Sequence, residues 1–149
     1  MSNKLMFSQR VDPNQKTFPV TPTKANPWDA GYDLYATDDY KIWAGQTVCI
    51  STGIHMSIPE GYYGRVADRS SMAKQHLHVV GGVIDSSYRG EIKVLLHFTE
   101  TLGSAEIKAG QKFAQIIITK ICELEPVVVD FADLPDSVRG ENGFGSSGK

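Results

Sequence analysis

Short runs of alternating apolar and polar residues dominate this chain from residue 40 onward. Alternation with a period of two is typical of strands that bury one face. Glycines and other turn residues separate the runs. We therefore expect strands over residues 40–44, 47–51, 54–58, 62–67, 78–85, 91–98, 105–108, 112–121 and 126–130.

The segments before and between these runs contain almost no helix. Residues 5–11 predict one more strand, and four prolines then keep the segment up to about residue 29 partly extended. Only residues 70–76 have a helical composition, with Ser70 or Ser71 as the capping residue. Many short strands with one short helix predict an all-β sandwich or barrel. A parallel α/β sheet is disfavoured because no helical segments lie between the strands.

Composition limits the partners of the chain. Its 149 residues fit one ordinary domain, and the net charge of -2 gives no bulk electrostatic reason to bind nucleic acid or membrane. We find no secretory signal and no apolar run of membrane-spanning length, so we expect an intracellular protein, cytoplasmic or nuclear. Cys49 and Cys122 lie in apolar runs and predict two buried free thiols.

The last eleven residues, 139–149, differ from the rest because glycine and serine dominate them. Residues 143–149 look like the start of a P-loop, but no buried strand precedes them and the final Ser or Thr is missing. Glycine backbone N–H groups can still converge on phosphate oxygens, Arg139 can bind them bidentately, and Phe144 can cover a base. The alternative is a disordered tail, which is the commoner state of such an end.

Two internal segments carry polar residues at the ends of apolar runs. Asp85 follows an apolar run in the segment 82–91, which predicts a β-hairpin; a partly buried carboxylate there would serve as a general base, or it simply caps a turn. Arg69, Ser70 and Ser71 stand where a strand meets a short helix, a place for polyphosphate or for an ordinary helix cap.

Two further polar residues interrupt apolar strands and therefore need partners. They are Asp33, within residues 30–36, and Gln115, within residues 110–118. Structural and functional roles are equally good for both. His76 and His78 have no third metal ligand nearby, so we assign them structural roles rather than a zinc site.

Taken in order, these segments resemble the five motifs of the trimeric dUTPase family. The matching segments are 30–36, 64–73, 81–91, 110–118 and 139–148, and the sequences Gly-Val-Ile-Asp and Gly-Phe-Gly-Ser make the resemblance specific. It implies a distorted jelly-roll-like β-barrel over residues 1–138, a flexible phosphate-binding arm over 139–149, and a homotrimer whose active sites are shared between subunits. It also implies Mg²⁺-dependent hydrolysis of dUTP to dUMP and pyrophosphate, which keeps uracil out of DNA.

The resemblance also implies a role for each site residue. Asp85 would activate the attacking water, and Tyr88 would pack under the deoxyribose. Asp33 would hold Mg²⁺ through water. The hairpin backbone, with Gly82, Val83 and Ile84, and the side chain of Lys93 would bind the uracil edge. The phosphates would be bound by Arg69, Ser70, Ser71, Gln115 and Arg139. Phe144 would cover the base, and Gly145 and Ser146 of the same arm would also contact the nucleotide.

The second motif departs from the family pattern. Asp68 stands where a proline is usual, and Ser71 where a glycine is usual. An anion beside a phosphate site should weaken binding unless it faces away. The departure leaves a second hypothesis open, in which the chain senses nucleotides with weak or no catalysis. Deamination of dCTP is disfavoured because the fifth motif is that of a dUTPase.

Overall fold

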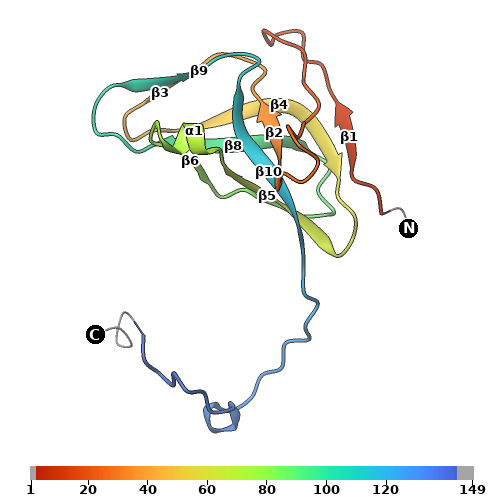
Figure 1. Ribbon diagram of the computed structural model, residues 1–149, viewed down its shortest axis with the longest axis vertical. Coiled ribbons are helices and arrows are strands. Elements are labelled where there is room, and N and C mark those ends of the chain that lie inside the picture. Colours follow the sequence, from red (N-terminus) through yellow and green to blue (C-terminus); the bar gives the residue numbers. More distant parts are fainter. Residues whose placement is uncertain (1–2, 144–149) are drawn as a thin grey trace.

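The computed structural model describes residues 3–143. Ten strands and one short α-helix form the body of the protein, and a 3₁₀ turn lies in the C-terminal segment (Figure 1). In chain order the elements are β1 (Met6–Gln9), β2 (Gly31–Tyr35), β3 (Tyr40–Trp43), β4 (Thr47–Ser57), β5 (Tyr62–Asp68), α1 (Ser70–Ala73), β6 (Leu77–Val80), β7 (Val83–Ile84), β8 (Glu91–Phe98), β9 (Ser104–Ile107), β10 (Lys112–Lys120) and η1 (Phe131–Asp133).

The strands form three antiparallel sheets. Sheet A has the order β1-β4-β8-β6, sheet B has the order β2-β10-β5-β7, and β3 pairs with β9 in a small third sheet. The prediction of an all-β, jelly-roll-like fold with one short helix is confirmed. In the described residues no ladder joins sheet A to sheet B, so the sheets do not close into a continuous barrel.

The core lies between the inner faces of sheets A and B. In β8 the residues Ile92, Val94, Leu96 and Phe98 are buried, and the residues between them face outward. This is the period-two pattern of a strand with one buried face. Sheet B buries Leu34, Phe113 and Ile116 against them, and β3 and β9 contribute Ile42 and Ile107.

Strand β4 is one strand of 11 residues, whereas the sequence predicted two strands that end and begin around Gly53. Gly53 adopts a φ of 65°, and the pairing with β8 is irregular between Ser51 and His55. Side chains replace the missing ladder bonds: the buried Thr52 hydroxyl donates to the carbonyl of Ile92 at 2.6 Å, and Glu91 Oε1 accepts the Gly53 N–H at 2.9 Å. The strand therefore continues through its glycine as a bulge.

The predicted strand over residues 78–85 is also wrong, since it is two strands in different sheets. Gly81 and Gly82, with φ of 77° and 93°, turn the chain from β6 in sheet A to β7 in sheet B. A Cβ on Gly82 would lie 2.8 Å from the Val66 carbonyl oxygen, so only glycine fits here. The crossing delivers Val83, Ile84 and Asp85 beside β5.

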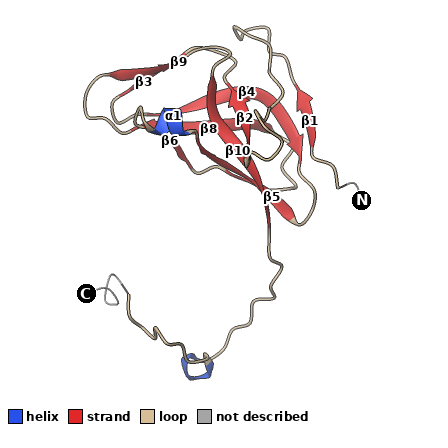
Figure 2. Cartoon of the chain, in the orientation of Figure 1, coloured by secondary structure: helices blue, strands red, loops and turns tan. Residues whose placement is uncertain are grey.

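Beyond β10 the chain leaves the body, and its path is extended apart from η1 and a turn at residues 139–142 (Figure 2). The strand predicted over residues 126–130 does not form, because no strand of the described chain pairs with it. Val128 and Val138 are fully exposed in this segment. Cys49 and Cys122 are free thiols, as predicted, but both are exposed, so the prediction of burial is wrong for the single chain. Within the described residues, no helix has the length and apolar character needed to cross a membrane.

Candidate active site

Asp33 is the centre of a cationic cluster on sheet B. Its Oδ1 accepts a hydrogen bond from Arg69 Nε at 2.9 Å, and its Oδ2 lies 3.0 Å from Lys112 Nζ. The hydrogen bond to Asp33 raises the pKa of Lys112 above its usual value, and the charge of the carboxylate adds to this effect. The cluster joins β2, β10 and the residue after β5. An anionic ligand that reached it would meet two cations held close together.

Gln115 ties the same cluster to the end of β5. It lies opposite Asp33 in the β2–β10 ladder, and its Nε2 donates to the backbone carbonyl of Asp68 at 2.8 Å. The amide fits because Gly31 has no side chain; a Cβ there would come within 2.2 Å of Gln115 Oε1. The prediction that this buried-strand amide has a defined partner is confirmed.

Arg69 itself caps α1, so the prediction that Ser70 or Ser71 does so is wrong. Arg69 has an extended backbone, with φ of -85° and ψ of 138°, and no side-chain hydrogen bond caps the helix. Ser70 opens the helix, and the Ser71 hydroxyl lies 3.4 Å from Arg69 Nη1. A cavity of about 350 Å³ opens here, and its lining residues are Ala25, Asp29, Ala30, Gly31, Asp33, Arg69, Ser70 and Gln115.

The segment after β7 forms a tight turn, but β7 pairs with β5 and not with β8. The prediction of a two-stranded hairpin is therefore wrong, although the turn itself is present. The Tyr88 N–H donates to the Asp85 carbonyl at 3.1 Å, and Arg89 Nη1 donates to the Ser86 carbonyl at 2.6 Å. His55 Nδ1 on β4 donates to the Arg89 carbonyl at 2.8 Å and so fixes the turn against sheet A.

Tyr88 lies directly over Gly90. Its hydroxyl donates to the Glu91 carbonyl at 3.0 Å, and an added Cβ on Gly90 would come within 2.2 Å of the same hydroxyl. A small cavity of about 180 Å³ lies beside the ring, lined by Val83, Ile84, Asp85, Tyr88, Glu91 and Lys93. Asp85 is exposed in the single chain, not partly buried as predicted.

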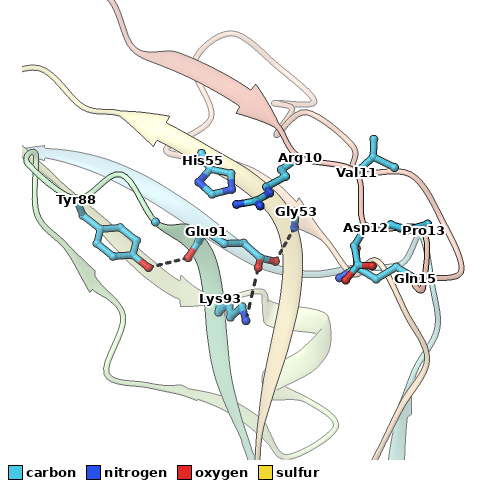
Figure 3. A pocket seen from close by; sticks show the side chains of 11 residues that line it. Arg10, Val11, Asp12, Pro13, Gln15, Gly53, His55, Tyr88, Glu91 and Lys93 are labelled. Atoms are coloured by element: carbon cyan, nitrogen blue, oxygen red, sulfur yellow. Dashed lines mark hydrogen bonds and ion pairs between the residues drawn. The ribbon is translucent and has the colours of Figure 1, made fainter.

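A larger cavity of about 660 Å³ adjoins this one and shares Tyr88, Glu91 and Lys93 with it (Figure 3). Arg10 and the residues after it form its other wall, and His55 projects into it from β4. Lys93 Nζ lies 3.6 Å from Glu91 Oε2. The sequence pattern pointed to no role for Arg10, His55 or Glu91, although Glu91 ends the third motif and His55 follows the break at Gly53.

Within one chain, the residues predicted to bind phosphate and those predicted to bind the nucleoside line separate cavities. The cavity beside Arg69 and the cavity beside Tyr88 share no lining residue. Arg139 belongs to neither; its Nε donates to the Asn142 carbonyl at 2.7 Å in an exposed turn. Phe144, Gly145 and Ser146 lie outside the described residues. In the described part of the chain, no three His, Cys, Asp or Glu residues are grouped to hold a metal ion.

His76 and His78 have structural partners, as predicted. His76 Nε2 lies 3.1 Å from Glu100 Oε1, and His78 Nδ1 lies 2.8 Å from Asp68 Oδ2.

Fold and site together define an all-β protein with one pocket at Arg69 and Asp33 and a separate pocket beside the Tyr88 ring. A family model described as dUTPase matches residues 19–148. The deoxyuridine 5'-triphosphate nucleotidohydrolase of Candida glabrata is 44% identical over 131 residues, which are 87% of this chain and 90% of that protein. The protein of the same name from Arabidopsis thaliana is 45% identical over 130 residues, or 87% and 76% of the two chains.

The solved structures agree. The dUTPase of Staphylococcus bacteriophage 80alpha with dUPNHPP superposes with a TM-score of 0.87 at 28% identity, over 99% of this chain and 100% of that one. The chain belongs to the dUTPase family. The prediction of a dUTP diphosphatase is thereby confirmed at the level of the family.

Proposed function

We propose that this chain hydrolyses dUTP to dUMP and pyrophosphate at a site built from both pockets. The observation that supports the proposal is that the two pockets present different kinds of side chain. One pocket presents Arg69, Ser70 and Gln115 beside a cationic cluster, which suits phosphate. The other presents Tyr88 over Gly90 with Asp85 at its edge, which suits a nucleoside and a base for water.

Asp85 is the general base in this proposal. Its carboxylate removes a proton from a water molecule whose oxygen attacks the α-phosphorus. The bond between the α-phosphorus and the bridging oxygen breaks, and pyrophosphate leaves with the electron pair. Support comes from the position of Asp85, which shares the small cavity with Tyr88 at the end of β7.

The nucleoside is recognised by the turn that follows β7. The backbone from Gly82 to Tyr88 and Lys93 on β8 would bind the uracil edge, and the Tyr88 ring would leave no room for a 2′-hydroxyl. The support is the fixed position of that ring, which one hydrogen bond and the absence of a Gly90 side chain both set.

The phosphates are bound by Arg69, Ser70, the Ser71 amide and Gln115. Arg69 would exchange its bond with Asp33 for bonds to phosphate when the nucleotide arrives, because a triphosphate carries more negative charge than one carboxylate. Lys112 would keep Asp33 paired during this exchange.

The residues fit a Mg²⁺ ion that the triphosphate itself chelates. No described group of protein ligands could hold the metal alone, so phosphate oxygens and water must supply most of its ligands. Asp33 can hold one of these waters, because each carboxylate oxygen has a second lone pair besides the one facing its cation. When bound, the ion would neutralise the phosphate charge.

The C-terminal arm and the assembly complete the proposal. Arg139 would clamp the γ-phosphate, and Phe144, Gly145 and Ser146 would close over base and phosphate. A homotrimer that shares its sites would bring the two pockets together across a subunit boundary. Support comes from the separation of the pockets in one chain and from the exposed apolar residues of segment 122–138. The intracellular location stays a prediction.

The deciding experiment offers purified protein dUTP with Mg²⁺, and dTTP, dCTP and UTP as comparison substrates. We expect pyrophosphate from dUTP alone. Asp85→Asn should keep nucleotide binding and lose turnover by orders of magnitude, because it keeps the shape of the side chain without its basicity. Turnover of this variant near the parent rate would reject Asp85 as the base.

A further inference from the structure

Asp68, the last residue of β5, joins the two large sheets through its side chain. Its Oδ1 accepts the Val79 N–H at 2.6 Å, and its Oδ2 lies 2.8 Å from His78 Nδ1. Both partners belong to β6, an edge strand of sheet A, whereas Asp68 belongs to sheet B. The carboxylate therefore satisfies a backbone donor at the open edge of β6.

The Asp68 carboxylate faces β6 and not the side chain of Arg69. An anion next to Arg69 would compete with phosphate, but both oxygens of Asp68 face donors of β6. Arg69 directs its Nε to Asp33 instead. A carboxylate only accepts hydrogen bonds, so His78 carries a hydrogen on Nδ1. The part of the sensing hypothesis that rests on the charge of Asp68 thereby loses its motivation.

The backbone of Asp68 is fixed from the opposite side. Its carbonyl oxygen accepts Gln115 Nε2 at 2.8 Å from β10, and its Cα pairs with Ala114 in the same ladder. The next residue is Arg69, the N-cap of α1. The place from which Arg69 and Ser70 extend is thus set by hydrogen bonds to two different sheets, both made by Asp68.

We propose that Asp68 is a positioning residue for the phosphate loop 69–71. The inference rests on the proposed binding of phosphate by Arg69 and Ser70. Asp68 contacts no phosphate itself; it holds the end of β5 against β6 so that the loop starts in one conformation. The side chain replaces, by hydrogen bonds, the fixed backbone that a proline gives at this position.

Two ligands separate a positioning role from a general structural one. The non-hydrolysable analogue dUpNHpp contains phosphates, and deoxyuridine contains none. We expect Asp68→Ala to weaken binding of the analogue by about tenfold, or about 1.4 kcal/mol, and to leave deoxyuridine within about twofold. Asp68→Asn should restore most of the affinity because its Oδ1 still accepts the Val79 N–H. Glu106→Gln, in an exposed pair with Lys108, is the matched control and should change neither.

Arg69→Ala is the reference for the proposed function. If it leaves analogue binding unchanged, the phosphate role of the loop fails and the inference fails with it. If Arg69→Ala weakens binding and a folded Asp68→Ala does not, only the positioning role is overturned. If Asp68→Ala weakens the binding of the analogue and of deoxyuridine equally, the positioning role is also overturned. Should Asp68→Ala not fold, His78→Ala removes one of the two bonds, and a loss of about threefold for the analogue alone is then expected; no such loss would overturn the inference.

Discussion

A methyl group added at Gly90 should weaken the discrimination between dUTP and UTP while leaving the fold nearly intact. In Gly90→Ala the new Cβ would lie 2.2 Å from the Tyr88 hydroxyl oxygen and 2.4 Å from its Cζ. Carbon atoms in contact normally lie about 3.5–4.0 Å apart. The ring must therefore move by at least about 1 Å, and it can, because it is the free end of a side chain that is 45% exposed.

The structure sets the size of both effects. The displaced ring loses its hydrogen bond to the Glu91 carbonyl, so stability should fall by about 1 kcal/mol. A shift of about 1 Å in a positioning group can lower the rate by about 100-fold. We therefore expect kcat/KM for dUTP to fall about 10- to 100-fold, and the preference for dUTP over UTP to shrink.

The assay is steady-state release of pyrophosphate from dUTP and from UTP, with thermal unfolding measured on the same samples. Gly61→Ala is the control, since it adds the same methyl group where nothing lies within 4 Å but at a φ of 81°. A side chain at such a φ costs roughly 1–2 kcal/mol, so this control should lose at least as much stability. Unchanged discrimination in Gly90→Ala would refute the role given to Tyr88.

Three more outcomes are expected. Phe113→Ala, in the fully buried core, should lower the free energy of unfolding by about 3–5 kcal/mol in urea titrations with an unchanged m-value. Asp33→Asn should raise several-fold the Mg²⁺ concentration that gives half the maximal rate, and an unchanged Mg²⁺ titration would contradict the outer-sphere role. The hydrogen bond from Lys16 lowers the pKa of Asp39 below 3.8, so its stabilising effect is present above that pH and is lost as the pH falls through the lower pKa. The stability gap between the parent and Asp39→Asn should therefore stay constant near neutral pH and close below about pH 4 in unfolding experiments.

Alternation and β-branched composition predicted the strands that pair with a neighbour on each side. Strand β8 forms over Glu91–Phe98 as predicted, and β10 and β5 differ from their predicted ranges by one residue at most. Each of these strands pairs with a neighbouring strand on both sides, so the local pattern is sufficient to predict it.

Long-range partners explain what local patterns could not predict. Strand β4 passes through Gly53 because Thr52 and Glu91, 40 and 38 residues from their partners, supply the missing bonds. Asp68 faces away from the phosphate loop because its partners lie on β6. The motif order predicted a set of site residues, but it gave neither the bonds of Asp33 nor the exposure of Asp85 in one chain.

The place of β10 in sheet B has a consequence for how the protein is made. β10 lies between β2 and β5, so neither of these strands has its main partner until residues 112–120 have been synthesised. Pairing over such a sequence separation is slow, because a long loop must close first. On the growing chain, Asp33 and Asp68 therefore cannot form their contacts with Lys112 and Gln115 until β10 has been synthesised. Sheet A, whose strands all precede residue 99, can form earlier and serve as the surface on which the pocket beside Arg69 is assembled last.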